Sequence, residues 1–330
     1  TIEDYPFDQL DAPVAASSTF SYASDDAETE PSGTGKQETY DVAIALTNPA
    51  LEGKVITTIE VPVLPSKKVG NLSVWLAKEL KTKLVDGKNE NIVNKQWTVA
   101  MPTSGKQQYV SVVLDTPYII PEGVLYVGYS LTVSDVDRSE ATQVPVVTAK
   151  ASKGGGFYLR TSRSFLSWQD RSEEFQVVAM TKVGLAGDVQ LDAATLGDIP
   201  YSYVSVGDEQ TVSVPVYNVG KNPITTLQYT STIDDSEYKG TVEFASPIPA
   251  VYAYSENVAF TLPVAGGKGE YEVTVEVTGV NGVDNGATEQ TKATGRAMVV
   301  KFVPKHLGLV EEFTGTWCGW CPAGYVAMEK

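Results

Sequence analysis

The sequence predicts an all-β protein whose main body is two tandem antiparallel β-sandwiches. Residues that favour strands, chiefly Val, Thr and Tyr, are abundant. Apolar and polar residues alternate in many short runs bounded by Gly, Pro or Asn, which is the period of a strand with one buried face. Long stretches with a helical period are nearly absent. A chain of 330 residues has room for two or three domains with separate cores.

The first sandwich is assigned to residues 19–183. Residues 1–18 precede it as an N-terminal arm, because they hold prolines and carboxylates without periodicity, and the acidic stretch 25–35 is expected to be a loop. Gly154-Gly155-Gly156 precedes a strand and lacks the Lys of a phosphate-binding loop, so it predicts a turn. The predicted strands are 40–46, 55–63, 72–76, 96–100, 109–114, 124–133, 143–148, 157–161 and 175–181.

The second sandwich is assigned to residues 184–303, after a glycine-rich break at 184–187. A hairpin is expected at Asp234, Asp235 and Glu237, where solvated carboxylates suit a turn. The number of strands suits an immunoglobulin-like sandwich, although the Cys, Trp, Cys pattern of antibody domains is missing. The predicted strands are 189–196, 201–206, 210–217, 227–233, 238–244, 256–262, 271–278 and 296–302.

The net charge of −16 narrows the possible partners. Nucleic acids and anionic membrane surfaces would repel such a chain, so neither is expected as a partner. No apolar run approaches the ~18 residues of a membrane span, so no span is expected in this chain.

The residues that suggest a chemical activity lie near the end of the chain, where its two cysteines form the motif Cys318-Gly319-Trp320-Cys321. An apolar run that suggests a buried strand precedes them, and a helix is expected to begin at the pair. The N-terminus of a helix lowers the pKa of a cysteine thiol and so favours the thiolate that attacks disulfides. In such a loop Cys318 attacks and Cys321 resolves the mixed disulfide.

Two neighbours of the pair have supporting roles in this hypothesis. Trp317 would cover the dithiol, and Pro322 would stand early in the helix, where a missing N–H costs little. The stretch from Glu312 to Pro322 resembles the active-site entry of thioredoxin-like proteins. It is more particularly similar to the 28-kDa outer-membrane-protein family of Bacteroidetes, which implies a thiol-disulfide domain placed after β-rich modules.

The β-rich regions carry weaker resemblances. The phrases Gly53-Lys54-Val55-Ile56, Leu72-Ser73-Val74-Trp75-Leu76 and Leu125-Tyr126-Val127-Gly128-Tyr129 resemble the jelly-roll modules of secreted Bacteroidetes adhesins. The turn phrase from Val216 to Ile224, with its Asn-Val-Gly, resembles bacterial immunoglobulin-like spacers of the cell-adhesion-related type. These resemblances imply a jelly-roll-like module followed by an immunoglobulin-like module. The role implied for the second module is spacing or presentation.

The thioredoxin-like segment, residues 304–330, is shorter than the ~50 residues of the smallest independent domains. It is therefore expected to be the N-terminal fragment of a domain that continues past Lys330, or else a tail that borrows a core from another chain. Whether the protein is an enzyme stays open, and the chain by itself is expected to be inactive. The lone histidine, His306, precedes the predicted strand and is expected to lie far from the thiols.

Metal sites have little support in the sequence. Two cysteines and one histidine are one ligand short of a structural zinc site, and no cofactor is expected. Asp135, Asp137 and Glu140 have the loop chemistry of a weak calcium site, but they lack a glycine-centred ligand loop, so an ordinary polar turn is favoured.

A surface for sugars is a further alternative. Trp75, Trp97 and Trp168 could form a stacking platform, although aromatic residues in alternating runs more often belong to a core. The tryptophans and the weak calcium candidates together leave a surface glycan ligand open.

The sequence thus favours an exported cell-envelope protein whose sandwiches bind or position a thioredoxin-like domain. Its expected partners are exported proteins with thiols or disulfides. The alternative is a non-enzymatic surface adhesion or scaffold protein that binds calcium or glycans weakly. Cysteine-free modules before an oxidisable pair suit the periplasm, the outer membrane or the cell surface. A lipid anchor upstream of Thr1 also stays open.

Overall fold

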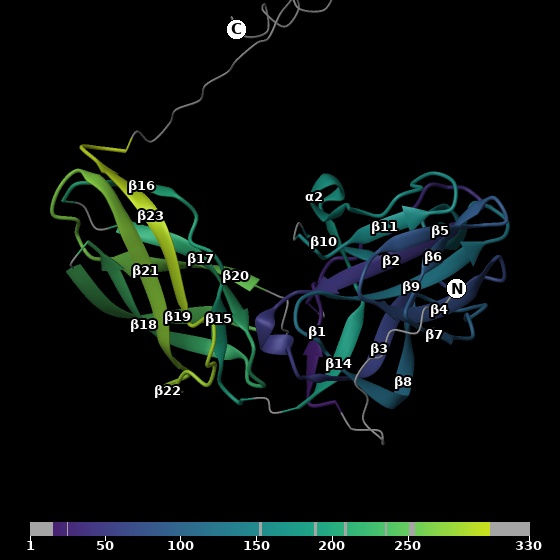
Figure 1. The fold of residues 1–330 in the computed structure, drawn as a ribbon, viewed down its shortest axis with the longest axis horizontal. Coiled ribbons are helices and arrows are strands. Elements are labelled where there is room, and N and C mark those ends of the chain that lie inside the picture. Colours follow the sequence, from purple (N-terminus) through teal and green to yellow (C-terminus); the bar gives the residue numbers. More distant parts are fainter. Residues whose placement is uncertain are drawn as a thin grey trace, which may run out of the picture.

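A computed structural model of the chain describes residues 16–24, 26–151, 154–187, 190–207, 210–234, 236–250 and 255–303. Over these residues the chain forms two antiparallel β-sandwiches that lie side by side (Figure 1). The all-β prediction is confirmed. Among the described residues no helix is both long and apolar enough to cross a membrane.

The first sandwich packs a four-stranded sheet, in the order β1-β14-β3-β8, against a six-stranded sheet, in the order β12-β11-β2-β9-β4-β7. The first and last strands are neighbours and pair antiparallel. The jelly-roll assignment is finer than this description and stays a prediction. The strands of the smaller sheet are β1 (Ser18–Phe20), β14 (Lys182–Ala186), β3 (Val55–Val63) and β8 (Gln108–Ile119). Those of the larger are β12 (Gln169–Asp170), β11 (Tyr158–Thr161), β2 (Thr39–Leu46), β9 (Leu125–Val133), β4 (Val69–Ala77) and β7 (Lys95–Thr98).

Smaller elements complete the first sandwich. A hairpin of β5 (Lys81–Val85) and β6 (Lys88–Ile92) turns at Asp86-Gly87, where both residues have positive φ. This is the backbone of a tight two-residue hairpin turn, which Asp-Gly favours. The remaining elements are β10 (Thr148–Lys150), β13 (Val177–Ala179), α1 (Glu140–Gln143), α2 (Ser172–Phe175) and the 3-10 helix η1 (Pro49–Leu51).

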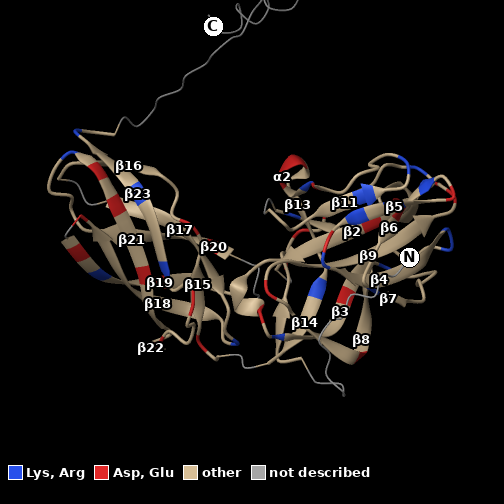
Figure 2. Cartoon of the chain, in the orientation of Figure 1, with Lys and Arg blue, Asp and Glu red and all other residues tan. Residues whose placement is uncertain are grey.

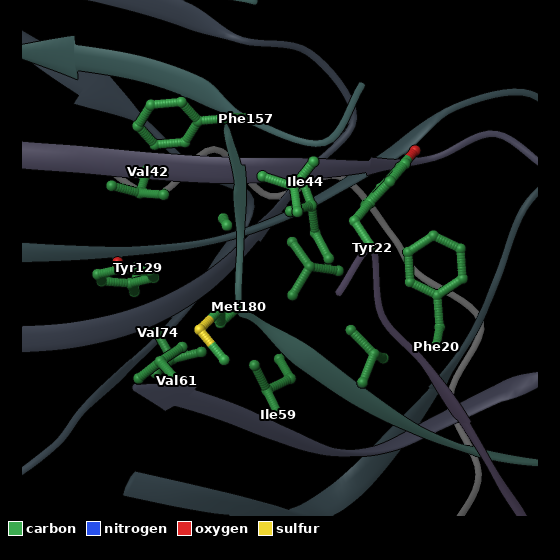
Figure 3. Close-up of a cluster of buried hydrophobic side chains, with 14 of the residues drawn as sticks. Phe20, Tyr22, Val42, Ile44, Ile59, Val61, Val74, Tyr129, Phe157 and Met180 are labelled. Atoms are coloured by element: carbon green, nitrogen blue, oxygen red, sulfur yellow. The ribbon is translucent and has the colours of Figure 1, made fainter. Parts of the chain in front are cut away.

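The main core lies between the two sheets of the first sandwich (Figure 3). Phe20, Ile59, Tyr129 and Phe157 are buried in it and come from both sheets and the segments beside them. Each fully buried apolar side chain of this size stabilises the fold by ~1.5–3 kcal/mol. Alternate residues of β2 (Tyr40, Val42, Ile44 and Leu46) enter this core, but the other face of β2 is buried as well, which a strand with one exposed face would not be.

The second sandwich packs the sheet β15-β17-β20 against the sheet β16-β23-β21-β18-β19. This order has the immunoglobulin type, with one further strand added to the larger sheet beyond β18. β16 pairs parallel with β23, and the other pairs are antiparallel. The strands are β15 (Ala194–Leu196), β16 (Ser202–Ser205), β17 (Gln210–Asn218), β18 (Ile224–Ile233), β19 (Ser236–Ile248), β20 (Ser255–Leu262), β21 (Gly269–Val280), β22 (Val283–Asp284) and β23 (Lys292–Val300).

The turn between β17 and β18 is organised by Asn218, which is buried. Its amide nitrogen donates to the carbonyl oxygens of Asn222 and Ile248, and its side-chain oxygen accepts from the Gly220 N–H. One side chain thus satisfies three backbone groups that the strands leave unpaired. The Asn-Val-Gly phrase is needed here for the shape of the turn.

Several sequence predictions are wrong in detail. The break expected at 184–187 is mostly β14, because Val183 and Leu185 point into the first core. Gly184 is glycine because a Cβ there would lie 2.0 Å from the Thr58 hydroxyl oxygen. The first sandwich therefore extends to Ala186, and the arm assigned to residues 1–18 ends one residue late, because Ser18 already pairs with Leu185.

Two other strands are misplaced. The strand predicted over 143–148 is the end of α1 followed by a short β10, and the strand over 175–181 is shortened to β13 by α2. The strand predicted over 189–196 is β15 alone within the described residues. The expected turn at Gly154–Gly156 and the hairpin after Ile233 are confirmed, with Asp234 at positive φ, while Asp235 lies outside the described residues.

Candidate functional site

The predicted redox segment lies outside the described residues. This applies to Cys318, Cys321 and the supporting residues Trp317, Gly319, Trp320 and Pro322. The whole assigned fragment 304–330, with His306, also lies there. The thiol chemistry therefore stays a prediction.

The calcium candidates surround an ammonium group. Lys68 Nζ lies 2.7 Å from Asp135 Oδ2 and 3.5 Å from Asp137 Oδ2. The other oxygen of Asp137 accepts from the backbone N–H and the hydroxyl of Ser139, at 2.8 and 2.5 Å. These hydrogen bonds hold the pKa of the Asp137 carboxyl below its ordinary value.

Glu140 begins α1 instead of joining the two aspartates around one point. In the part of the chain that the structure describes, no three His, Cys, Asp or Glu side chains are grouped to hold a metal ion. The loop is built as a polar turn tied to Lys68, which is the alternative that the sequence favoured.

The tryptophans do not form a common platform. Trp97 packs toward the main core, with its ring 5.7 Å from that of Tyr118. Trp75 and Trp168 meet edge to face at 5.8 Å on the opposite side of the six-stranded sheet. Trp75 is 1% exposed, so it offers no free face for a sugar.

That opposite side, here called the outer face, carries a row of polar residues at directly paired positions. Ser73 is opposite Ser130 across β4 and β9, Ser130 is opposite Asp41 across β9 and β2, and Asp41 is opposite Arg160 across β2 and β11. Because side chains opposite each other in a sheet share a face, these four residues form one line across it.

Hydrogen bonds connect Ser130, Asp41 and Arg160 within this line, and Trp75 joins them. The Trp75 indole N–H donates to Ser130 Oγ at 3.0 Å, and that hydroxyl donates to Asp41 Oδ1 at 2.6 Å. Arg160 pairs with the second oxygen of Asp41, and both charged side chains are almost fully buried. Burial raises the pKa of the Asp41 carboxyl, while the hydrogen bonds from Ser130 and Arg160 oppose that shift.

A second row of directly paired residues on the outer face accounts for the packing of the Trp75 ring. Trp75 is opposite Gly128, which is opposite Ala43, which is opposite Tyr158. A Cβ on Gly128 would lie 2.3 Å from the Trp75 ring, so the indole lies across the glycine. Burial raises the pKa of Tyr158 to about 12.

The β5–β6 hairpin covers part of this outer face. Arg160 donates through Nη2 to the carbonyl oxygen of Asn89 on β6, and the Trp168 indole N–H donates to Asn91 Oδ1 at 3.1 Å. A charged side chain in the sheet thus binds the backbone of the hairpin. The sequence patterns predicted no strand between residues 76 and 96, where this hairpin lies.

Beyond the polar row the outer face opens into a groove of about 630 Å³. Thr39 and Thr132 are opposite each other in its floor, with their hydroxyl oxygens 3.0 Å apart. The hairpin tip and the loop 162–166 form its sides. Its lining residues are Gln37, Glu38, Thr39, Leu84, Gly87, Lys88, Asn89, Thr132, Val133, Ser134, Ser162, Arg163 and Leu166.

Glu38 fixes the loop at one side of the groove. Its Oε2 accepts from the backbone N–H groups of Arg163 and Ser164, both at 3.0 Å, and its Oε1 accepts from the hydroxyls of Ser164 and Thr34. Burial alone would raise the pKa of the Glu38 carboxyl, but these hydrogen bonds outweigh it and lower the pKa.

Two further hollows lie where the sandwiches meet. One of about 780 Å³ is lined by residues of both sandwiches, from Pro49 and Ile120 to Ala193 and Glu289. Another of about 600 Å³ has Tyr22 and Tyr217 in its walls. Since Ala193 and Val219 pack into the first core, this region also joins the two sandwiches.

The comparisons with known proteins identify no family. No protein-family model matches the chain, and no curated protein matches it. Among solved structures, the CARDB domain of a Pyrococcus furiosus protein, in complex with di-metal ions, is 19% identical with a TM-score of 0.25. That match covers 35% of this chain and 95% of the other.

Red sea bream transglutaminase matches 84% of this chain and 31% of its own, at 12% identity and a TM-score of 0.23. The CupB6 tip adhesin of Pseudomonas aeruginosa matches 91% of this chain and 100% of its own, at 8% identity and a TM-score of 0.14. Likenesses this distant carry no argument about function.

Proposed function

We propose that residues 16–303 are the binding and positioning region of an exported protein whose chemistry is carried by the Cys318–Cys321 segment. The observation that supports this most is the presence of two cores, one from Phe20 to Leu185 that also includes Ala193 and Val219, and one from Ala194 to Val299. The predicted dithiol stands shortly after β23, the last strand of the second core. Two closed modules before a reactive segment suit a spacer that presents it.

The polar groups of the described region support a structural role for that region. Asp41 and Arg160 form an ion pair under the hairpin. The Glu38 carboxylate accepts hydrogen bonds from the backbone N–H groups of Arg163 and Ser164. A general base needs a free lone pair within reach of a substrate proton. Glu38 accepts from four donors of its own chain, and Asp41 is buried between Ser130 and Arg160, so both carboxylates serve the fold and support a binding role for the region.

The test is the chemistry of the two thiols. The potential of the Cys318–Cys321 pair is measured by equilibration in glutathione buffers, followed by trapping of free thiols. We expect a reversible pair with a potential above about −300 mV, as for exchange-active dithiols. Insulin reduction is then measured in a polypeptide that extends past Lys330.

Cys318→Ser is the matched control for this test. It is expected to abolish exchange and insulin reduction while both sandwiches melt as before. A buried disulfide below about −300 mV that reacts with neither glutathione nor insulin would contradict the redox role. That result would favour the alternative, a non-enzymatic surface adhesion or scaffold protein.

A further inference from the structure

We propose that the groove between the β5–β6 hairpin tip and the loop 162–166 binds an acidic peptide segment that carries an apolar side chain. This deepens the binding role proposed above. It does not depend on the thiol pair, because every residue involved belongs to the first sandwich.

The first argument is charge. Lys88 on the hairpin and Arg163 on the loop line opposite sides of the groove. Neither makes an ion pair with any residue that the structure describes. A third cation, Lys36, reaches the loop at the Ser164 hydroxyl, 3.3 Å away. Figure 2 shows Lys and Arg positions near β5 and β11 and in the loops beside them.

The chain carries a net charge of −16, yet the groove is lined by two cations that no carboxylate of the described residues pairs with. Two cations without such partners at one groove create a local positive potential, and a concave site concentrates it. The one carboxylate in the lining, Glu38, already accepts from four donors of its own chain. The groove therefore offers donors and selects an anionic ligand.

The second argument is the apolar part of the same groove. Leu84 on the hairpin is 69% exposed, and Leu166 on the loop is 52% exposed. Both belong to the lining of the groove, Leu84 from the hairpin that also carries Lys88 and Leu166 from the loop that also carries Arg163. A ligand side chain placed between them would remove both from water, at ~25 cal/mol per Å² of buried apolar surface.

The third argument is that both sides are held in place before a ligand arrives. Arg160, 2% exposed, binds the backbone of Asn89 at the hairpin, and Glu38, 3% exposed, binds the backbone of Arg163 and Ser164. Binding to such a site costs less ordering entropy than binding to a mobile loop.

The ligand chemistry follows from the combination. Polypeptide supplies carboxylates and an apolar side chain within a few residues, and its backbone carbonyls can accept from the hydroxyls of Thr39 and Thr132. An acidic glycan would supply the charge, but it normally stacks on aromatic rings, and none lines this groove. Trp75 and Trp168 lie in the covered part of the outer face.

The experiment uses the whole chain and a fluorescein-labelled peptide of alternating Glu and Leu, followed by fluorescence anisotropy. We expect saturable binding that weakens as salt rises, because the cations are exposed. Lys88→Ala and Arg163→Ala should each weaken binding about three- to tenfold, and Leu166→Ser should do so to a similar degree. The variants should melt like the parent chain.

Lys292→Ala is the matched control, since it removes an exposed cation from the second sandwich and should leave binding unchanged. A peptide of alternating Glu and Ser tests the apolar contribution and should bind more weakly. The proposal is overturned if the Glu-Leu peptide does not bind saturably, if the three groove variants bind like the control, or if oligogalacturonate binds more tightly than the peptide. None of these results bears on the thiol potential.

Discussion

The two sandwiches differ most in what they do with the outer face of the larger sheet. In the second sandwich that face is left to water, and Glu270 and Arg296 form an exposed pair there, with side chains 40% and 69% exposed. In the first sandwich a similar pair, Asp41 and Arg160, is 4% and 2% exposed under a hairpin. The same two-sheet architecture therefore gives a solvent-exposed outer face in one case and a covered, polar outer face with an adjoining groove in the other.

The contrast between the outer faces therefore depends on the β5–β6 hairpin and not on the cores. Both cores are built from alternating Val, Ile, Leu and aromatic residues. The cluster around Trp75 takes Leu80 and Val93 from the two ends of the β5–β6 hairpin, and the hairpin tip lines the groove. The predictions below test this contrast from the largest effect to the smallest.

Replacing Trp75 with Ala should destabilise the first sandwich by about 3–5 kcal/mol, as for a core aromatic residue. The loss combines buried area, the contact with Gly128 and the hydrogen bond to Ser130. Urea unfolding followed by circular dichroism measures it. A loss below about 1 kcal/mol would mean that the outer face is not a second core.

Breaking the buried ion pair should cost almost as much. Arg160→Met leaves Asp41 buried without its cation, and we expect a loss of about 3–5 kcal/mol. The double variant Asp41→Leu with Arg160→Met should recover most of that loss, because both charges are then absent. If single and double variants are equally unstable, the pair is not the source of the effect.

The Glu38 carboxyl should make loop stability depend on pH. Its folded-state pKa is lowered, so its contribution is present above the unfolded pKa of about 4.3 and is lost as pH falls through the folded pKa. Glu38→Gln should cost about 1–2 kcal/mol at pH 7, and this difference should shrink in acid.

Thermal melts of the Glu38→Gln variant and the parent chain at several pH values measure the effect. Glu237→Gln, a change at an exposed carboxylate of the second sandwich, is the control and should show no such trend. A constant difference between the Glu38 variant and the parent from pH 3 to pH 7 would contradict the role of the ionised carboxylate.

The smallest effect is expected at the exposed pair of the second sandwich. Arg296→Ala should change stability by less than about 0.5 kcal/mol, because water screens the pair. The same urea experiment serves here. A loss comparable with that of Arg160→Met would remove the contrast between the two faces.

The sequence predicted the second sandwich better than the first, for a physical reason. Strands such as β17 and β20 have one face in the core and one in water, so their alternation is visible in the sequence. Six of the ten residues in β5 and β6 are Lys, Asn or Glu, and no alternation marks them. Only the Asp86-Gly87 turn signalled a hairpin there.

The candidate site could not have been predicted from the sequence in the same way. Asp41 and Arg160 are 119 positions apart and meet only through the order of β2 and β11 in the sheet. Glu38 and Ser164 are separated by 126 positions. No local sequence pattern predicts contacts between residues so far apart. The tryptophans Trp75, Trp97 and Trp168, which the sequence did mark as candidates for sugar binding, are packing residues.

We propose that the first sandwich binds a peptide ligand and that the second sandwich acts as a spacer. Amide hydrogen exchange of the whole chain, with and without the Glu-Leu peptide, tests it most directly. We predict added protection at the β5–β6 tip and at residues 162–166, and none in β15 to β23. Protection in the second sandwich, or none in either sandwich, would contradict the account.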